Sequence, residues 1–295
     1  MYRTVRKNLL VVPGSPVTLI VRCDSSNWLV DPGMGSDRFN ILADVLSKIN
    51  MYEYDILVSH THYDHIEVLP YFRGKRIYVN ESEYSQLISP LVREHATYGF
   101  NPLPRLMGLQ RLVVPSEDVS TFSLRVISRL DCLELLDLSG HSPGLTGFIV
   151  DDVVFVGDSL FGDALLKRVG IPYHADVFKS LKVLNEVLGK LSDKGFDAVL
   201  SHGPVVKSLK FKELVSLNIQ RLEYIMKLLN DELSVGGSIE ELAVRVLKKL
   251  EVDVSASNVY LSCATISSII SKLYEDRVVE HVISDEGVKW RLVRH

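Results

Sequence analysis

Six consecutive residues carry the side chains best suited to chemistry in this sequence. The stretch His60–His65 reads His-Thr-His-Tyr-Asp-His. Imidazole nitrogen and carboxylate oxygen are ligands of Zn²⁺ and related first-row ions. In extended backbone His60 and His62 point to the same side and can bind one ion. Beyond a turn, Asp64 and His65 would face a second ion. The alternative is a polar surface loop rich in histidine, but chance rarely assembles this pattern.

Three further candidate ligands follow predicted strands. His141, Asp158 and His202 each come after an apolar, strand-like run and lie beside a Gly or Ser. Rigid scaffolds place functional side chains at such positions. Taken alone, a His after a strand is more often structural. Together with the first cluster, however, these residues give five His and two Asp, which is a ligand set for two metals.

The predicted secondary structure explains how these side chains could meet. The apolar run Ile56–Val58 predicts a buried strand that ends at the His-rich stretch. Strands followed by helices occur twice before Pro204, which predicts an α/β (α+β) fold with two sheets covered by helices. Beyond Pro204, three helical patterns and one hairpin pattern outline a winged helix. We therefore expect one domain at 1–204 and a helical, winged-helix-like domain at 205–295.

Read in order, four motifs resemble those of the metallo-β-lactamase fold superfamily. They are His-x-His-x-Asp-His, Gly-His-Ser-Pro-Gly, Gly-Asp-Ser and Ser-His-Gly, and the resemblance covers about residues 9–204. It is greatest to the glyoxalase II-like hydrolases and the lactamase-like endoribonucleases, and it implies a four-layer αβ/βα sandwich. By this resemblance His60, His62 and His141 bind one metal, Asp64, His65 and His202 bind the other, and Asp158 bridges them. Asp31, in Val-Asp-Pro-Gly, matches a family motif whose carboxylate supports the ligands.

Such a site would activate water. Two cations a few ångströms apart lower the pKa of a shared water and polarise the bond to be cleaved, so we expect hydrolysis by a metal-bridging hydroxide. Asp64 would bind metal and orient the hydroxide, and Asp158 would set the separation of the metals. Zn²⁺ is the expected ion at both positions, with Fe or Mn as alternatives, because His and Asp sites accept several metals.

The residues that select the substrate lie outside these motifs. A stretch from His95 to Met107, broken by Pro and Gly, fits neither the helix nor the strand period and predicts a surface loop or a lid. The candidate substrate contacts are His95, Tyr98, Phe100, Arg105, Tyr173 and His174. For each, a packing or surface role is the alternative. The leading hypothesis is hydrolysis of a small-molecule thioester, ester or phosphoester.

The alternative function is an endoribonuclease-like phosphodiesterase that holds RNA or another nucleic acid through residues 205–295. A helix that binds phosphates should carry a cationic stripe. Residues 257–276 contain Lys272 as their only Lys or Arg, and the hairpin adds a small cluster of Lys289, Arg291 and Arg294. We therefore expect the C-terminal domain to wall the pocket or to form a homodimer contact rather than to bind nucleic acid.

Composition predicts a soluble protein that stays away from membranes. The net charge of -4 gives no general attraction to nucleic acid or to anionic lipid. The apolar run Leu9–Val12 is too short for a signal peptide or a membrane span, so we expect a cytoplasmic protein. Cys23, Cys132 and Cys263 are far apart in the sequence. This spacing predicts free thiols and a reducing compartment.

Overall fold

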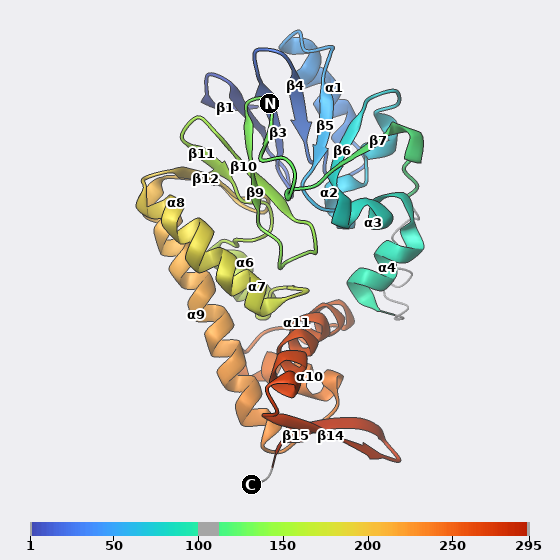
Figure 1. Cartoon of the computed structure of the whole chain (residues 1–295), viewed down its shortest axis with the longest axis vertical. Helices are drawn as coiled ribbons and strands as arrows, with labels where there is room; N and C mark the ends of the chain where they lie inside the picture. The colour runs from blue at the N-terminus through green and yellow to red at the C-terminus, as the bar shows by residue number, and fades with distance from the viewer. Residues whose placement is uncertain (1, 100–111, 294–295) are drawn as a thin grey trace.

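Two β-sheets lie side by side at one end of the molecule, in the upper half of Figure 1. The structure is a computed structural model that describes residues 2–99 and 112–293. The first sheet contains β1 (Arg3–Arg6), β2 (Leu9–Val12), β3 (Thr18–Arg22), β4 (Asn27–Val30), β5 (Asp55–Val58), β6 (Ile77–Asn80) and β7 (Val119–Phe122) in sequence order. Its pairs are antiparallel from β1 to β4 and parallel from β4 to β7.

The second sheet has the order β13-β12-β11-β10-β9-β8. Its strands are β8 (Arg129–Leu130), β9 (Leu133–Asp137), β10 (Thr146–Val150), β11 (Val153–Phe155), β12 (Asp197–Val199) and β13 (Val205–Val206). The pair β11 and β12 is parallel, and the other pairs are antiparallel. The parallel pairs in both sheets direct the carboxyl ends of several strands to one edge, where loops can carry functional side chains.

Successive side chains along a strand point to opposite faces of its sheet, so the apolar residues of one strand pack in two different layers. In β5, Leu57 packs between the two sheets, whereas Ile56 and Val58 pack on the outer face of the first sheet. In β11, Phe155 packs between the sheets and Val154 lies on the outer face of the second sheet. Helices cover both outer faces. The four-layer αβ/βα fold expected from the sequence is therefore confirmed.

The helices that cover the sheets come from both halves of the chain. On the side of the first sheet are α1 (Arg38–Lys48), α2 (Tyr63–Ile66), α3 (Tyr84–Ile88), α4 (Pro90–Tyr98) and the 3₁₀ turns η1 (Leu69–Tyr71), η2 (Glu81–Glu83) and η3 (Ser116–Asp118). On the side of the second sheet are α6 (Asp163–Val169), α7 (Val177–Lys182), the π-helical segment η4 (Val183–Leu188), α8 (Gly189–Asp193) and α9 (Ser208–Leu233). None of the helices in the described part of the chain combines the length and the apolar character that a bilayer crossing requires.

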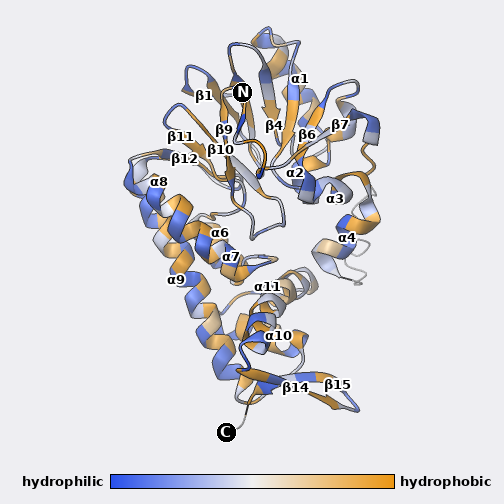
Figure 2. Ribbon diagram, in the orientation of Figure 1, coloured by the Kyte–Doolittle hydropathy of each residue, from blue (hydrophilic) through white to orange (hydrophobic). Residues whose placement is uncertain are grey.

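The C-terminal segment continues the apolar core of the second sheet. Helix α9 runs from that sheet to the far end of the molecule, where α10 (Ile239–Lys249), α11 (Ala256–Glu275) and the hairpin β14 (Val279–Ser284) and β15 (Gly287–Leu292) lie (Figure 1). The strands of the sheets are largely hydrophobic, whereas α9 mixes hydrophobic and hydrophilic residues along its length (Figure 2). One buried cluster joins the outer face of the second sheet to α9, α10, α11 and β14. The helices and the hairpin occur in the expected order, and the domain limits at 204 and 205 stay a prediction.

Two expectations from the sequence are wrong. Cys23 and Cys132 form a disulfide, with Cα atoms 5.5 Å apart, and only Cys263 is free. The cysteines lie 109 residues apart, but the turns after β3 and before β9 place them side by side. The prediction of free thiols, and the argument for a reducing compartment drawn from it, therefore fail.

The second correction concerns the stretch predicted to be irregular from His95 onward. Its first residues belong to helix α4, which extends to Tyr98. The helix begins at Pro90, a residue favoured in the first turn, and the Ser89 side chain accepts a hydrogen bond from the Val92 N–H. This cap separates α4 from the preceding helix α3 and lets α4 continue into the stretch predicted to be irregular. Residues 100–111 lie outside the described part of the chain.

Candidate metal centre

The segments that follow β5, β9, β11 and β12 bring the seven candidate ligands together at one edge of the two sheets, with Asp64 and His65 in the short helix α2. Glycines make two of these turns possible. Gly140, with a φ of 143°, precedes His141, and Gly157, with a φ of 53°, precedes Asp158. L side chains rarely adopt such positive φ values. At Gly140 a Cβ atom would also lie 2.6 Å from the backbone nitrogen of Ser180. The two glycines therefore let each turn present the next side chain to the edge.

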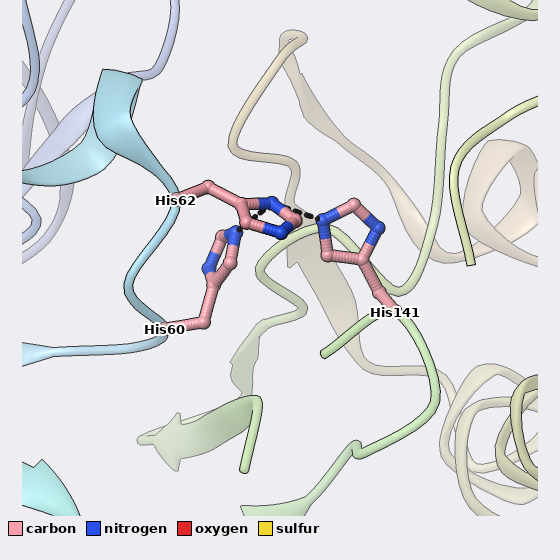
Figure 3. A group of neighbouring side chains, drawn as sticks. All are labelled: His60, His62 and His141. Atoms are coloured by element: carbon pink, nitrogen blue, oxygen red, sulfur yellow. Dashed lines mark hydrogen bonds between the residues drawn. The ribbon is translucent and has the colours of Figure 1, made fainter. Parts of the chain in front are cut away.

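Three imidazoles form the first group of candidate ligands (Figure 3). His60 and His62 come from the loop after β5, and His141 comes from the opposite side. His62 Nδ1 lies 3.2 Å from His60 Nε2 and 2.9 Å from His141 Nε2. His60 and His141 are buried, with 0% and 4% of their surface exposed. Three converging imidazole nitrogens are a donor set that Zn²⁺ accepts.

A second group surrounds the carboxylate of Asp158. Its Oδ2 lies 3.6 Å from His141 Nε2 and 3.2 Å from His202 Nε2, and its Oδ1 lies 3.5 Å from His65 Nε2. Asp64 completes the group, with Oδ2 at 3.2 Å from His202 Nε2. Asp158 thus faces His141 of the first group as well as the histidines of the second.

Two buried atoms in this cluster test whether a cation would fit. His65 Nε2 and Asp158 Oδ1 are buried, and neither has a hydrogen-bond partner in the described part of the chain. Buried polar atoms are normally satisfied, and an exception calls for an explanation such as an ion. Both atoms are metal-ligand types and lie within one group that could hold an ion. The donor set therefore fits divalent cations.

The histidines are oriented by partners on their other ring nitrogens. His65 Nδ1 donates to Asp31 Oδ2 at 2.8 Å, and Asp31 also accepts from the Ser59 N–H and hydroxyl at 2.8 and 2.6 Å. His141 Nδ1 donates to the Tyr173 carbonyl at 2.8 Å. An Nδ1 that donates leaves the Nε2 lone pair for a metal. Asp31, which the family resemblance implies as a supporting carboxylate, thus contacts His65, and its role at a metal stays a prediction.

Glu83 is a structural residue of the site that sequence reasoning missed. It is fully buried, and its Oε2 accepts from the Thr61 N–H at 3.1 Å and from the Thr61 hydroxyl at 2.6 Å. Its Oε1 accepts from the Ser142 hydroxyl at 2.7 Å and from the Gly144 N–H at 2.8 Å. Because Thr61 and Ser142 adjoin candidate ligands, Glu83 joins the two loops that carry the three-histidine group.

Burial and charge set the protonation of the cluster. Burial, together with the neighbouring His65 and His62, lowers the pKa of His60 well below its usual range, so its imidazole is neutral. Burial opposes ionisation of Asp158, but His202 and His65 outweigh it and hold its pKa well below the usual range. His60 and Asp158 therefore have the forms that ligate metals. Burial opposes protonation of His65 and His202, but Asp158 outweighs it, raising the pKa of His65 well above its usual range and that of His202 to about 10, so a cation bound there would take the place of protons.

A cavity of about 430 Å³ opens beside the cluster. The lining residues are Met34, His62, Tyr63, Asp64, Thr97, Tyr98, Asp158, Arg168, Tyr173 and Leu261. The predicted substrate contacts Tyr98 and Tyr173 are thus in the wall. His95 is exposed on α4 and His174 is buried, and neither lines this cavity.

Two of the predicted substrate contacts, Phe100 and Arg105, lie outside the described residues. Conversely, no motif in the sequence singled out Arg168 and Leu261, which come from α6 and α11 and line the cavity. The cavity therefore joins the metal cluster to elements from distant parts of the chain.

Comparisons with known proteins agree with this geometry. The family model of the Metallo-beta-lactamase superfamily matches residues 11–202. Over 153 residues the chain is 30% identical to a probable metallo-hydrolase of Streptococcus pyogenes, covering 48% of this chain and 60% of that protein. Over 194 residues it is 24% identical to a hydroxyacylglutathione hydrolase of Shewanella pealeana, covering 66% of this chain and 62% of that protein. The chain thus spans about 60% of the length of these curated relatives.

Two solved structures share the fold over nearly all of the chain. A metallo-beta-lactamase family protein of Thermus thermophilus has a TM-score of 0.72 at 14% identity, covering 98% of this chain and 100% of that chain. A beta-lactamase domain protein of Burkholderia ambifaria has a TM-score of 0.72 at 13% identity, covering 99% of this chain and 93% of that chain. At such identities the likeness concerns the fold alone.

Proposed function

The chain belongs to the metallo-beta-lactamase superfamily, and on that premise we propose that it is a hydrolase that uses two divalent cations to cleave a small-molecule thioester, ester or phosphoester. The observation that carries the proposal is the convergence of seven His and Asp side chains at one edge of the sheets. We assign one cation to His60, His62 and His141, the other to Asp64, His65 and His202, and the bridging position to Asp158. Zn²⁺ is the proposed ion, with Fe and Mn as alternatives.

The residues around the cluster suit hydrolysis. Cations bound there would supply Lewis acidity, which lowers the pKa of water and polarises the scissile oxygen. Asp64 lines the cavity and its side chain is 33% exposed, so a carboxylate oxygen can accept a proton from the attacking water. Tyr98 also lines the cavity beside the cluster, where burial raises the pKa of its phenol to about 12.

The dimensions and charge of the cavity support a small substrate. Its volume of about 430 Å³ is within the range of small-molecule pockets. Its wall combines Leu261 and the two tyrosines with polar groups at the cluster. Among the described residues that line it, Arg168 carries the only permanent positive charge and would attract a single anionic group rather than a phosphate chain.

The C-terminal cations that could favour RNA are mostly neutralised by neighbouring acids. Arg291 pairs with Glu280 at 2.8 Å, Lys289 pairs with Glu286, and Lys272 pairs with Asp276 at 2.6 Å. Binding to phosphates requires cations that are free to replace counterions. These pairs therefore support the small-molecule hypothesis over the endoribonuclease-like alternative.

Metal analysis and an activity screen test the proposal. The purified protein should bind about two equivalents of Zn²⁺ and hydrolyse at least one member of a panel of thioesters, lactones and phosphodiesters. Asp158→Ala should lose bound metal and lower kcat/KM by at least about 100-fold, because a direct ligand should exceed the 10- to 100-fold effect typical of supporting residues. Asp163→Ala, which removes an exposed carboxylate paired with Lys167, is the control and should leave both unchanged.

Three outcomes would overturn parts of this proposal. Turnover that persists in Asp158→Ala would refute the bridging assignment. A wild-type protein that binds no transition metal after reconstitution would refute the metal centre. Salt-dependent RNA binding, together with RNA cleavage and no small-molecule turnover, would replace the proposal with the endoribonuclease-like alternative.

A further inference from the structure

One face of α11 contacts both the cavity and the loop that supports His141. Leu261, Thr265 and Ser268 are spaced by four and three residues, so they lie on one side of the helix. Leu261 lines the cavity, and the Ser268 hydroxyl accepts a hydrogen bond from the Val177 N–H at 2.9 Å. Thr265, between them, is fully buried. The C-terminal segment therefore reaches the metal centre through this face.

The hydroxyl of Thr265 holds the backbone on both sides of Tyr173. It donates to the Pro172 carbonyl at 2.8 Å and accepts from the His174 N–H at 2.9 Å. Both backbone groups are part of a buried segment, so water could not easily replace the hydroxyl. A single side chain from α11 thus determines where the peptide groups of Tyr173 lie.

The segment that Thr265 holds in turn orients His141. The Tyr173 carbonyl accepts from His141 Nδ1 at 2.8 Å. Further along the same loop, Ala175 donates its N–H to the His141 carbonyl at 3.2 Å, and the Asp176 N–H donates to the Gly140 carbonyl at 2.8 Å. The same short loop therefore supports both the ring and the backbone of one candidate metal ligand.

We propose that Thr265 is a positioning residue for His141, and that α11 is thereby a structural part of the three-histidine metal site. This inference rests on the proposed function, because it assumes that His141 binds metal. Metal–imidazole bonds depend on direction, so His141 Nε2 binds an ion well only when the ring is held in one orientation. The hydrogen-bond partner of Nδ1 sets that orientation. Loss of the Thr265 hydroxyl would free the Tyr173 carbonyl to move, and the His141 ring with it.

Thr265→Val tests the proposal because it removes the hydroxyl and keeps the shape of the side chain. Thr265→Ser keeps the hydroxyl and serves as the conservative variant. Ser271→Ala, at an exposed position of the same helix, is the matched control. The readouts are the Kd for Zn²⁺ measured by competition with a chelator and the visible absorption spectrum of the Co²⁺-loaded protein, which reports ligand geometry.

We expect Thr265→Val to bind the ion of the three-histidine site about tenfold more weakly, at the lower end of the range for supporting residues, and to alter the Co²⁺ spectrum. Thr265→Ser and Ser271→Ala should match the wild type. Equal affinity and an unchanged spectrum in folded Thr265→Val would overturn this inference and leave the proposed function intact. A wild-type protein that binds no metal would overturn both. If Thr265→Val does not fold, Thr265→Ala is read by the same criteria.

Discussion

His65, which follows the first sheet's β5, is supported differently from His141 and His202, which follow strands of the second sheet. On the side of the first sheet, His65 donates to the buried carboxylate of Asp31 at 2.8 Å. On the side of the second sheet, His141 donates to the Tyr173 carbonyl, and His202 Nδ1 lies 2.9 Å from the Ser15 hydroxyl. Hydrogen bonds that involve a charged partner are roughly twice as strong as neutral ones. A charged group therefore orients His65, whereas neutral groups and loop packing orient His141 and His202.

This difference determines how strongly metal binding on each side depends on the surrounding loops. A carboxylate beside an imidazole raises its basicity and keeps the proton on Nδ1, whatever the surrounding loops do. A backbone carbonyl performs the same role only while its own loop is held in place. On the side of His141 that loop depends on α11, more than 90 residues further along the chain. Substitutions of the supporting groups on the two sides should therefore lower metal affinity by different amounts.

Among the groups that support the candidate ligands, the largest effect is expected for Asp31→Asn. If the amide oxygen of the new side chain accepts the hydrogen bond from the Ser59 N–H, the amide NH₂ group faces His65 Nδ1. His65 Nδ1 must then accept a hydrogen bond instead of donating one. The proton of His65 would move to Nε2, the atom that faces Asp158, and metal binding there would be blocked. We expect the affinity for the ion assigned to Asp64, His65 and His202 to fall by about 10- to 100-fold, measured by chelator competition.

The backbone at position 31 makes Asn a suitable replacement. Asp31 has a φ of 50°, a conformation that Asn also tolerates, so the substitution should not add backbone strain. Circular dichroism and the melting temperature should stay close to those of the wild type. Unchanged metal affinity in a folded Asp31→Asn protein would show that the charge of this supporting group does not matter, and the comparison between the two sides would fail.

A smaller effect on metal binding is expected for Glu83→Gln. Each carboxylate oxygen of Glu83 accepts one backbone N–H, from Thr61 or from Gly144. Gln offers only one oxygen, so its NH₂ group must face one of these N–H groups and leave it without an acceptor. The cost should be about 1–3 kcal/mol of unfolding free energy, measured by urea denaturation.

The metal affinity of the three-histidine group in Glu83→Gln should fall by less than the affinity of the His65 site in Asp31→Asn, because the hydrogen bonds of Glu83 go to Thr61, Ser142 and Gly144 and hold the loops. Glu213→Gln, a change of the same kind at an exposed position of α9, is the control for stability. A Glu83→Gln protein as stable as the wild type would contradict the role of this carboxylate in joining the two loops.

Local patterns in the sequence predicted the fold layers and the clustering of the candidate ligands. The strand at Ile56–Val58 and the His-rich stretch after it are contiguous, and the alternation of side chains along a strand follows from its backbone. The positions of His141, Asp158 and His202 depend on the same rule, a side chain after a strand. These features could be predicted because each is encoded within a few residues.

Apart from helix α4, whose cap at Ser89 and Pro90 is local, the features that were missed depend on contacts between distant residues. Glu83 bonds to Thr61 and Ser142, which are 22 and 59 residues away, and Thr265 bonds to residues more than 90 positions away. The disulfide spans 109 residues, and the same two turns are also joined by hydrogen bonds from the Ser25 and Ser26 hydroxyls to Asp131. No local pattern marks such pairs, because only the packing of the two sheets brings them together.

The smallest effect should come from Ser15→Ala, which tests the neutral side of the comparison directly. The Ser15 hydroxyl lies 2.9 Å from His202 Nδ1, but Ser15 is exposed, so a water molecule can take the place of the hydroxyl. A neutral hydrogen bond of this kind contributes about 0.5–1.5 kcal/mol, and replacement by water recovers most of it. We therefore expect metal affinity to fall by less than about threefold, with Ser47→Ala, at an exposed position on α1, as the control. A loss as large as that of Asp31→Asn would mean that a neutral partner orients its histidine as firmly as a buried carboxylate does, and the distinction between the two sheets would have to be given up.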